Sequence, residues 1–182
     1  MNPLLGFVPF IVFVVLVRLS DNLALWVAFS AAFALAMHSF LETRVLRTLD
    51  LSSLVLFGLL ALYKGFLRPG LPLGTELLLV EGAIFIVLLA SLVLQKPCTL
   101  QYTREPVLPK PQDSSRLVRA HYVVTGIWLA AFAIMTAADI AAALTPKISV
   151  NIAMAAGLVA LAAALTFSVR YSAGALELEH PS

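Results

Sequence analysis

The stretch GTELLLVEGAIFIVLLASLVL, residues 74–94, decides the fold class of this chain. A helix that crosses a membrane needs about 20 mostly apolar residues. This stretch reaches that length, and its charged side chains are Glu76 and Glu81. Its apolar residues follow one another on all sides, without the alternation of a barrel strand. We therefore predict a transmembrane helix here.

The composition of the whole chain points the same way. Of its 182 residues, 61% are hydrophobic and 12% are charged, whereas soluble proteins average about 45–50% apolar and about 25% charged residues. A water-soluble domain of this size has too much surface to hide so many apolar side chains. The composition also excludes disordered and collagen-like chains, and the single Cys98 excludes a disulfide scaffold. An integral membrane protein is predicted, lying in a lipid bilayer.

Six stretches are apolar and long enough to span a membrane. An all-α transmembrane bundle is therefore predicted, forming a single domain over residues 1–172. Its spans are expected at 3–19, 23–41, 51–66, 74–94, 117–144 and 149–171. The first and third stretches are short, so five crossings remain an alternative. A polar loop is expected at 95–116 and a polar tail at 173–182. The first stretch lacks a basic leader and a cleavage site, so we expect it to be retained.

The basic residues predict the orientation of these six spans. The side that holds both termini would carry eight of them: Arg44, Arg47, Lys96, Arg104, Lys110, Arg116, Arg119 and Arg170. The opposite side would carry four: Arg18, Lys64, Arg68 and Lys147. Because Lys and Arg concentrate in cytoplasmic loops, both termini and the loop 95–116 are predicted to be cytoplasmic. The net charge of +2, with no long basic run, argues against a nucleic-acid partner.

Small residues predict which spans pack most closely. In lipid, helices associate through close backbone approach and polar contacts, which small side chains permit. Alanines recur every four residues in the spans 23–41, 117–144 and 149–171. These three spans are expected to form the tight centre of the bundle. The alternative is that alanine is simply frequent in this chain.

Four ionisable residues are expected to form an intramembrane polar cluster: Arg18, Asp21, Glu81 and Asp139. A charge at the centre of a span costs about 2.5–3.5 kcal/mol on insertion scales, so each needs a partner or a wet cavity. Arg18 is expected to pair with Glu81 or Asp139 as a packing clamp. A proton or solute relay is the alternative. Glu76 lies near its helix start and is expected to be solvated there, where it also favours the helix dipole.

A second polar group lies at the other end of the predicted spans. His38 and Glu42 are four residues apart on one helical face, and His121 opens the fifth span at a similar depth. A metal site would need all three in one cluster. Snorkelling or capping is the favoured interpretation, so neither a metal nor a cofactor is predicted. The sequence has no nucleophile, nucleotide-binding or haem motif, and the chain is predicted not to be an enzyme.

The loop 95–116 contains four prolines and cannot form one continuous helix. A short interfacial segment is expected between Pro97 and Pro106. It offers a candidate surface for a protein partner, formed by Lys96, Pro97, Gln101, Tyr102, Arg104 and Glu105. A connecting loop whose basic residues anchor the topology is the alternative. Cys98 could be acylated at the interface, although an inert thiol is the favoured interpretation.

Two motifs resemble a known family. GFVPFIVFVVLVRLSD, residues 6–21, resembles the start of intracellular septation protein A, with Pro9, Phe13, Arg18, Leu19 and Asp21 at the matching places. KPCTLQYTRE, residues 96–105, is similar to a Lys-Pro-Phe-Thr-Leu-Gln-Tyr-Ala-Arg-Glu motif in an uncharacterised branch of such proteins. The resemblance implies a bacterial inner-membrane protein linked to cell division and envelope synthesis, and it carries over no catalytic residue.

Three functional hypotheses follow from the sequence. The first is a non-enzymatic scaffold that contacts proteins of the division or envelope machinery, or a second copy of itself. The second is a small transporter, which requires Arg18, Glu81 and Asp139 to line one water-accessible cavity. The third is an intramembrane enzyme, which requires His38, Glu42 and His121 to meet within reach of a metal. The placement of these residues separates the three.

Overall fold

The computed structural model describes residues 3–44, 46–102, 111–145 and 149–177, and within these ranges the secondary structure is helical, without strands. The elements are η1 (Pro3–Phe7), α1 (Val8–Leu16), α2 (Asp21–Thr43), α3 (Thr48–Leu62), η2 (Tyr63–Leu67), α4 (Leu73–Val93), η3 (Cys98–Tyr102), α5 (Pro111–Leu144) and α6 (Val150–Glu177). Here η1 and η3 are 3₁₀ turns and η2 is a π-helical turn that continues α3. The predicted all-α bundle is confirmed.

Five helical stretches are long and apolar enough to cross a membrane. They contain 20 to 27 residues each and lie at Asp21–Glu42, Thr48–Leu67, Leu73–Val93, Val118–Leu144 and Val150–Tyr171. At about 1.5 Å per residue, each reaches the thickness of the hydrocarbon core, about 30 Å. The protein is therefore a multi-pass integral membrane protein.

The first predicted span forms a shorter helix than expected. Its apolar helical part, Leu5–Leu16, has 12 residues, which corresponds to about 18 Å of α-helix. The helix stops before Arg18, and Ser20 then begins α2 by accepting a hydrogen bond from the backbone N–H of Leu23. A serine N-cap of this kind favours a new helix start over continuation of the old one. Among the described residues, five helices thus have the length of a full span and α1 is shorter, so the alternative of five crossings stays open.

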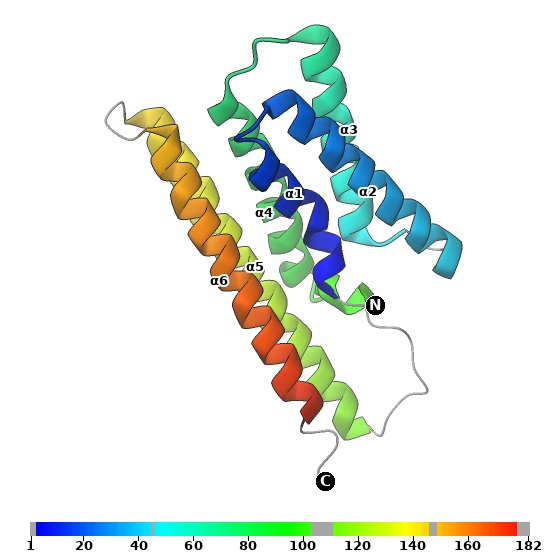
Figure 1. Ribbon diagram of the computed structural model, residues 1–182. Helices are drawn as coiled ribbons and strands as arrows, with labels where there is room; N and C mark the ends of the chain where they lie inside the picture. The colour runs from blue at the N-terminus through cyan, green and yellow to red at the C-terminus, as the bar shows by residue number, and fades with distance from the viewer. Residues whose placement is uncertain (1–2, 45, 103–110, 146–148, 178–182) are drawn as a thin grey trace.

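The short helix α1 lies inside the bundle (Figure 1). The long pair α5 and α6 flanks it on one side, and α2 with α3 flanks it on the other. Helix α4 packs along α5. The turn η1 lies against η3 at one end of the molecule, and α1 leads from there to the start of α2 near the opposite end.

Aromatic side chains fasten α1 to its neighbours. Phe7, Phe10 and Phe13 are fully buried. The ring of Phe7 stacks on that of Trp128 from α5, with centroids 3.8 Å apart and planes 6° apart. Phe10 and Phe13 both contact Phe57 of α3, at 5.3 Å and 5.5 Å between centroids. Aromatic pairs with centroids about 4.5–7 Å apart, such as the two with Phe57, add about 0.5–1.5 kcal/mol each beyond area burial.

The packing centre expected from the alanines is therefore wrong in part. Helices α5 and α6 do pack together, but α2 packs on α1 and α3. The α2 alanines face inward there, with Ala24, Ala28 and Ala32 fully buried. Small side chains let α2 approach its neighbours closely, while phenylalanine side chains fill the centre of the bundle. Helix α5 also starts earlier than expected, at Pro111, because proline suits the first turn of a helix.

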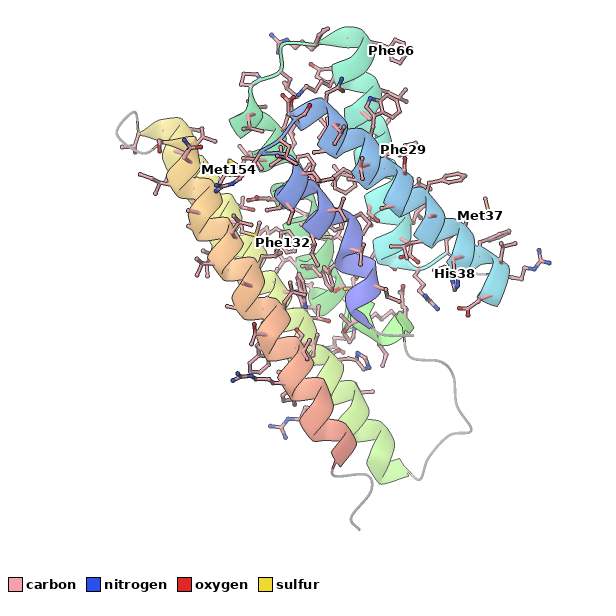
Figure 2. The ribbon with its side chains drawn as sticks, viewed as in Figure 1. Phe29, Met37, His38, Phe66, Phe132 and Met154 are labelled. Carbon is pink, nitrogen blue, oxygen red and sulfur yellow. The ribbon has the colours of Figure 1, made fainter. Side chains whose placement is uncertain are left out.

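The outer faces of the long helices are apolar. Figure 2 shows Met37 of α2 and Phe66 of η2 pointing outward, whereas Phe132 of α5 points into the bundle. Phe66 is 78% exposed and Phe132 is fully buried. Large apolar side chains on the outside are what a lipid environment favours, because lipid tails solvate them as well as a protein core does.

Candidate functional site

Lys64 forms the centre of a charged group at one end of the bundle. Its Nζ lies 2.5 Å from Oδ2 of Asp21 and also donates a hydrogen bond to Oε1 of Glu76. Lys64 and Glu76 are buried, whereas the Asp21 side chain is 43% exposed. We call these three residues the Lys64 triad. It ties α2 and α4 to the end of α3, and it satisfies a buried lysine with two carboxylates.

Local structure positions each member of the triad. The π-helical turn Tyr63–Leu67 carries Lys64, and turns of this type often mark functional sites. Glu76 lies in the first turn of α4, which begins after Pro72, and Asp21 is the first residue of α2. Glu76 was expected to be solvated, and this is wrong, because the side chain is fully buried against Lys64.

Lys64 was not among the predicted site residues. In the sequence it reads as one of the basic residues that mark a loop. The order of the spans could have indicated its partners. The end of the third span, which carries Lys64, lies on the same side of the membrane as the starts of the second and fourth spans, which carry the two carboxylates. A small recess of about 170 Å³ opens beside the triad, lined by Asp21, Asn22, Lys64, Gly65 and Pro69.

Glu81 and Asp139 form a second polar group, deeper in the bundle between α4 and α5. Both residues are buried, at 4% and 6% exposure, and their carboxyl groups lie close enough to interact electrostatically. One oxygen of each, Oε2 of Glu81 and Oδ2 of Asp139, is buried without a hydrogen-bond partner among the protein atoms described. Two ionised carboxylates are both acceptors, so a hydrogen bond between them requires one proton.

The four residues of the predicted intramembrane cluster therefore do not meet at one place. Asp21 joins the Lys64 triad, and Glu81 joins Asp139. Arg18 is exposed beyond the end of α1, and no ion pair found among the described residues includes it. The expected pairing of Arg18 with Glu81 or Asp139 is wrong, because α1 ends too early to bring the guanidinium between α4 and α5.

At the other end of the bundle, the turn η3 is docked between helices. The Thr99 hydroxyl lies 2.8 Å from that of Thr125 and donates to the backbone carbonyl of His121 at 3.2 Å. Gln101 reaches α3, where its Oε1 accepts from the Thr48 backbone N–H at 2.7 Å and its Nε2 donates to the Thr48 hydroxyl at 2.8 Å. Gln101 thereby caps the start of α3 from 53 residues away along the chain.

A further buried polar contact supports this end. The Ser39 hydroxyl of α2 donates to Oδ2 of Asp50 in α3 at 2.5 Å, and Nη1 of Arg47 donates to the Ser39 oxygen at 3.2 Å. All three residues are buried. Further along α5, the Trp128 indole N–H donates to the Ser168 hydroxyl of α6 at 3.1 Å. Hydrogen bonds thus connect α2 to α3, η3 to α3 and α5, and α5 to α6.

The residues predicted to bind a partner lie in different surroundings. Lys96 and Gln101 are exposed, whereas Pro97 is buried together with Cys98 and Thr99. Tyr102 ends η3, and its side chain lies outside the described part of the chain, as do Arg104 and Glu105. Burial raises the pKa of the Cys98 thiol above its usual range, so little reactive thiolate forms there.

The three candidate metal ligands are separated. Nδ1 of His38 lies 3.8 Å from Oε2 of Glu42, one turn along α2. His121 is buried and its Nδ1 lies 3.2 Å from the Thr99 hydroxyl. Within the described ranges, no three His, Cys, Asp or Glu side chains gather as a metal site would require. The intramembrane-enzyme hypothesis required His38, Glu42 and His121 to meet in one cluster, and His121 instead contacts Thr99.

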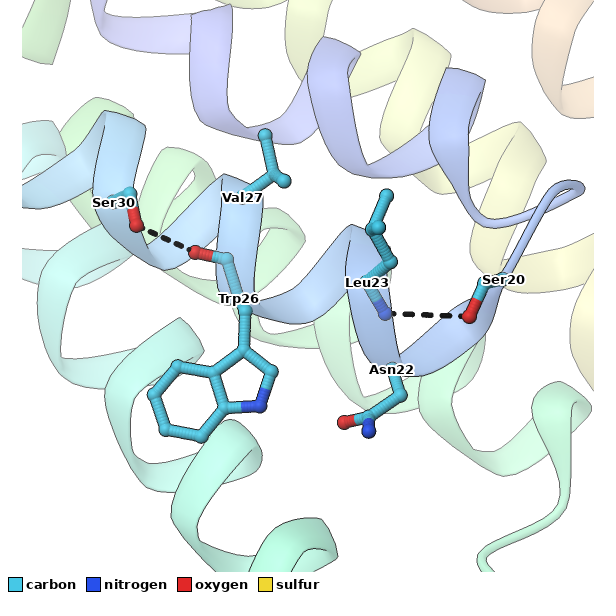
Figure 3. Close-up of a pocket in the computed structure, with 6 residues that line it drawn as sticks. All are labelled: Ser20, Asn22, Leu23, Trp26, Val27 and Ser30. Carbon is cyan, nitrogen blue, oxygen red and sulfur yellow. Dashed lines mark hydrogen bonds between the residues drawn. The ribbon is translucent and has the colours of Figure 1, made fainter.

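A recess of about 490 Å³ lies on the outer face of α2 (Figure 3). Its lining residues are Ser20, Asn22, Leu23, Trp26, Val27 and Ser30. The Ser30 hydroxyl donates to the Trp26 carbonyl at 2.8 Å, so it is already satisfied within the helix. An apolar, shallow face near the end of a span, with an indole on it, suits the interface between lipid tails and headgroups.

These sites and the fold define the class of this protein: a multi-pass helical membrane protein with buried polar groups at both ends and a carboxyl pair between two spans. No family model, curated protein or solved structure matches the chain.

Proposed function

We propose that the protein is a non-catalytic scaffold of the bacterial inner membrane that holds other membrane proteins during envelope and septum assembly. The observation that carries this proposal is the fastening of the bundle at both ends. Lys64 joins α2 and α4 to η2 at one end, and Gln101 and Thr99 join η3 to α3 and α5 at the other. A bundle fastened in this way keeps its outer faces in a constant relation, as a scaffold requires.

The same contacts argue against alternating access. A transporter of that kind rocks one part of its bundle against another around a central site. Opening either end here would leave buried polar groups unsatisfied, at a cost of about 1–3 kcal/mol for each one. The transporter hypothesis also required Arg18 beside Glu81 and Asp139, and Arg18 lies elsewhere. The scaffold is the better supported of the two functions.

The division-related part of the proposal rests on sequence. The motifs RLSD at residues 18–21 and KPCTLQYTRE at 96–105 resemble the septation family. The excess of basic residues on the side of the termini favours a cytoplasmic location for both ends. In Figure 1, η1 and the last turns of α6 point toward the same end of the bundle, which agrees with this topology.

A cross-linking experiment in cells tests the scaffold against the transporter. Thr48→Cys and Gln101→Cys, combined with Cys98→Ser, place two thiols where η3 docks on α3. We expect cells that lack the protein to grow longer than wild-type cells and to form their septa late. Because this variant lacks the hydrogen bonds between Gln101 and Thr48, it should restore division only in part, and it should do so more fully after a short bis-maleimide bridges the two thiols.

The Thr48→Cys variant without the second cysteine, treated in the same way, is the control for the reagent. Loss of complementation on bridging alone would show that this end must move and would favour transport. Normal cell length and septum placement in cells without the protein would refute the role in division.

A further inference from the structure

We propose that Glu81, Asp139 and Thr136 form an intramembrane site that holds one monovalent cation, either a proton or a sodium ion. This site goes beyond the scaffold function and can be tested without any partner. The starting observation is that two neighbouring carboxyl groups, both more than nine-tenths buried, each keep a buried oxygen without a partner among the described protein atoms. Two ionised carboxylates are both acceptors and repel each other, so the pair needs a proton or another cation between its oxygens.

Three buried oxygens at this place lack a hydrogen-bond partner among the described protein atoms. Oε2 of Glu81, Oδ2 of Asp139 and the Thr136 hydroxyl are all buried, and none has a partner among the described protein atoms. A threonine within a helix ordinarily donates back to a carbonyl one turn earlier, as Thr166 does to Ala162 at 2.7 Å. Buried polar groups left unpaired are costly, so a ligand that binds all three oxygens would stabilise the bundle.

Thr136 belongs to the same interface as the carboxyl pair. It precedes Asp139 by three residues, so the two lie on one face of α5. A Cβ placed on Gly82, the neighbour of Glu81, would lie 4.0 Å from Thr136 Cγ2. The three oxygens therefore come from facing positions of α4 and α5. Carboxylate and hydroxyl oxygens are hard donors that suit a hard cation.

Charge balance allows a proton and a sodium ion to replace each other. The singly protonated pair carries one net negative charge, and a fully ionised pair with one sodium ion carries the same. No ion pair found among the described residues joins a lysine or arginine to either carboxyl. Lys64, which lies on the same side of the bundle, contacts Asp21 and Glu76 instead. Either cation can thus replace the other without adding charge to the membrane interior.

The carboxyl pair lies toward one end of α5. Asp139 lies five residues before the end of α5 at Leu144, about 8 Å along the helix axis. The site is therefore near one membrane surface, on the side of the Lys64 triad, where exchange with solution needs no path across the bundle.

Infrared spectroscopy of the purified protein in detergent micelles tests the site. Spectra are recorded over a range of pH in choline chloride and in sodium chloride. We expect the wild-type protein to show the absorption of a protonated carboxyl that sodium removes and choline does not. For one sodium ion displacing one proton, the sodium concentration needed should fall about tenfold for each unit of increase in pH.

Three variants assign the signal. Glu81→Gln with Asp139→Asn should abolish it, because two amides can keep a hydrogen bond but cannot titrate. Glu42→Gln, which changes a partly exposed carboxyl at the other end of the bundle, should leave the signal unchanged. Thr136→Val removes a hydroxyl at nearly constant volume, so it should keep the carboxyl absorption and weaken its removal by sodium. Should the double variant not fold, Thr136→Val still tests the site.

Each alternative has its own result. A carboxyl absorption that responds to pH but not to sodium assigns the site to a proton alone and supports the proposal in that form. An absorption that responds to neither pH nor sodium would overturn it, because the pair would then be a permanent hydrogen bond or one bridged by a trapped water. Identical spectra from the wild type and the double variant would also overturn it.

Discussion

Replacing Lys64 by methionine removes a buried cation that holds two carboxylates. Methionine keeps the length and much of the volume of the side chain, so packing changes little. The loss is then chiefly electrostatic. Glu76 is left fully buried with its charge unpaired, and Asp21 is left partly exposed to water.

The expected cost follows from these two exposures. Breaking a buried ion pair by removal of one partner costs about 3–5 kcal/mol, because the other charge stays buried. The contact to the exposed Asp21 contributes about 0.2–1 kcal/mol. We therefore expect Lys64→Met to lower the free energy of unfolding by about 4 kcal/mol. Asp21→Asn, which removes only the exposed link, should cost less than about 1 kcal/mol.

The measurement is reversible unfolding in mixed micelles, followed by the fluorescence of the two tryptophans. A double-mutant cycle with Glu76→Gln isolates the pair itself. Because the neutral amide needs no cation, Lys64→Met should cost at least about 2 kcal/mol less in the Glu76→Gln background. A loss below about 1 kcal/mol for Lys64→Met, or simple additivity of the two changes, would refute the role assigned to the Lys64 triad.

Three further predictions concern the other contacts. Gln101→Ala should destabilise the protein by about 1–2 kcal/mol, because α3 loses its cap, and the same unfolding assay measures this; an unchanged stability would place η3 outside the fold's core contacts. Trp128→Phe should lower the free energy of unfolding by about 1–3 kcal/mol, because Ser168 loses its hydrogen-bond donor. Trp128→Ala should lower it by about 3–5 kcal/mol, because the ring is lost as well. An unchanged stability of Trp128→Phe would mean that the indole N–H contributes nothing. Cys98 should resist a membrane-permeant maleimide at neutral pH and react only after unfolding, since the buried thiol has a raised pKa; rapid labelling of folded protein, read by mass spectrometry, would contradict this.

Hydropathy was sufficient to predict the long helices, because membrane thickness imposes their length. The spans expected at 74–94 and 23–41 match α4 and α2 within about two residues at each end. The first stretch forms a shorter helix than predicted, because hydropathy cannot distinguish a lipid-facing helix from one buried in protein. Its phenylalanines at 7, 10 and 13 repeat every three residues and so share one face. That pattern carried the missing information, since rings gathered on one face need partners in other helices.

The candidate site was less predictable from the sequence. The position of a charged residue within its span indicates its depth in the membrane, but it does not indicate which other charged residue it contacts. Asp21, Glu81 and Asp139 lie in the same half of the bundle, yet α4 presents Glu76 to Lys64 and Glu81 to Asp139. These two glutamates are five residues apart, about 140° around the helix, and so face different neighbours. Assigning partners requires the order of helices around the bundle, which no single sequence reveals. Likewise, Gln101 and Thr48 are separated by 53 residues, and only the fold brings them together.

The two charged groups of this bundle differ in a way that bears on function. In the Lys64 triad a cation of the protein itself meets the carboxylates, so the group is complete as a structural contact. Between α4 and α5, two carboxyls face each other with three buried oxygens free and without a lysine or arginine found in contact among the described residues. A purely structural contact at that position would be more stable as an apolar pair. The chain has instead placed an acidic pair beside a hydroxyl at an otherwise apolar interface, which is the arrangement expected where the cation comes from solution and can leave again.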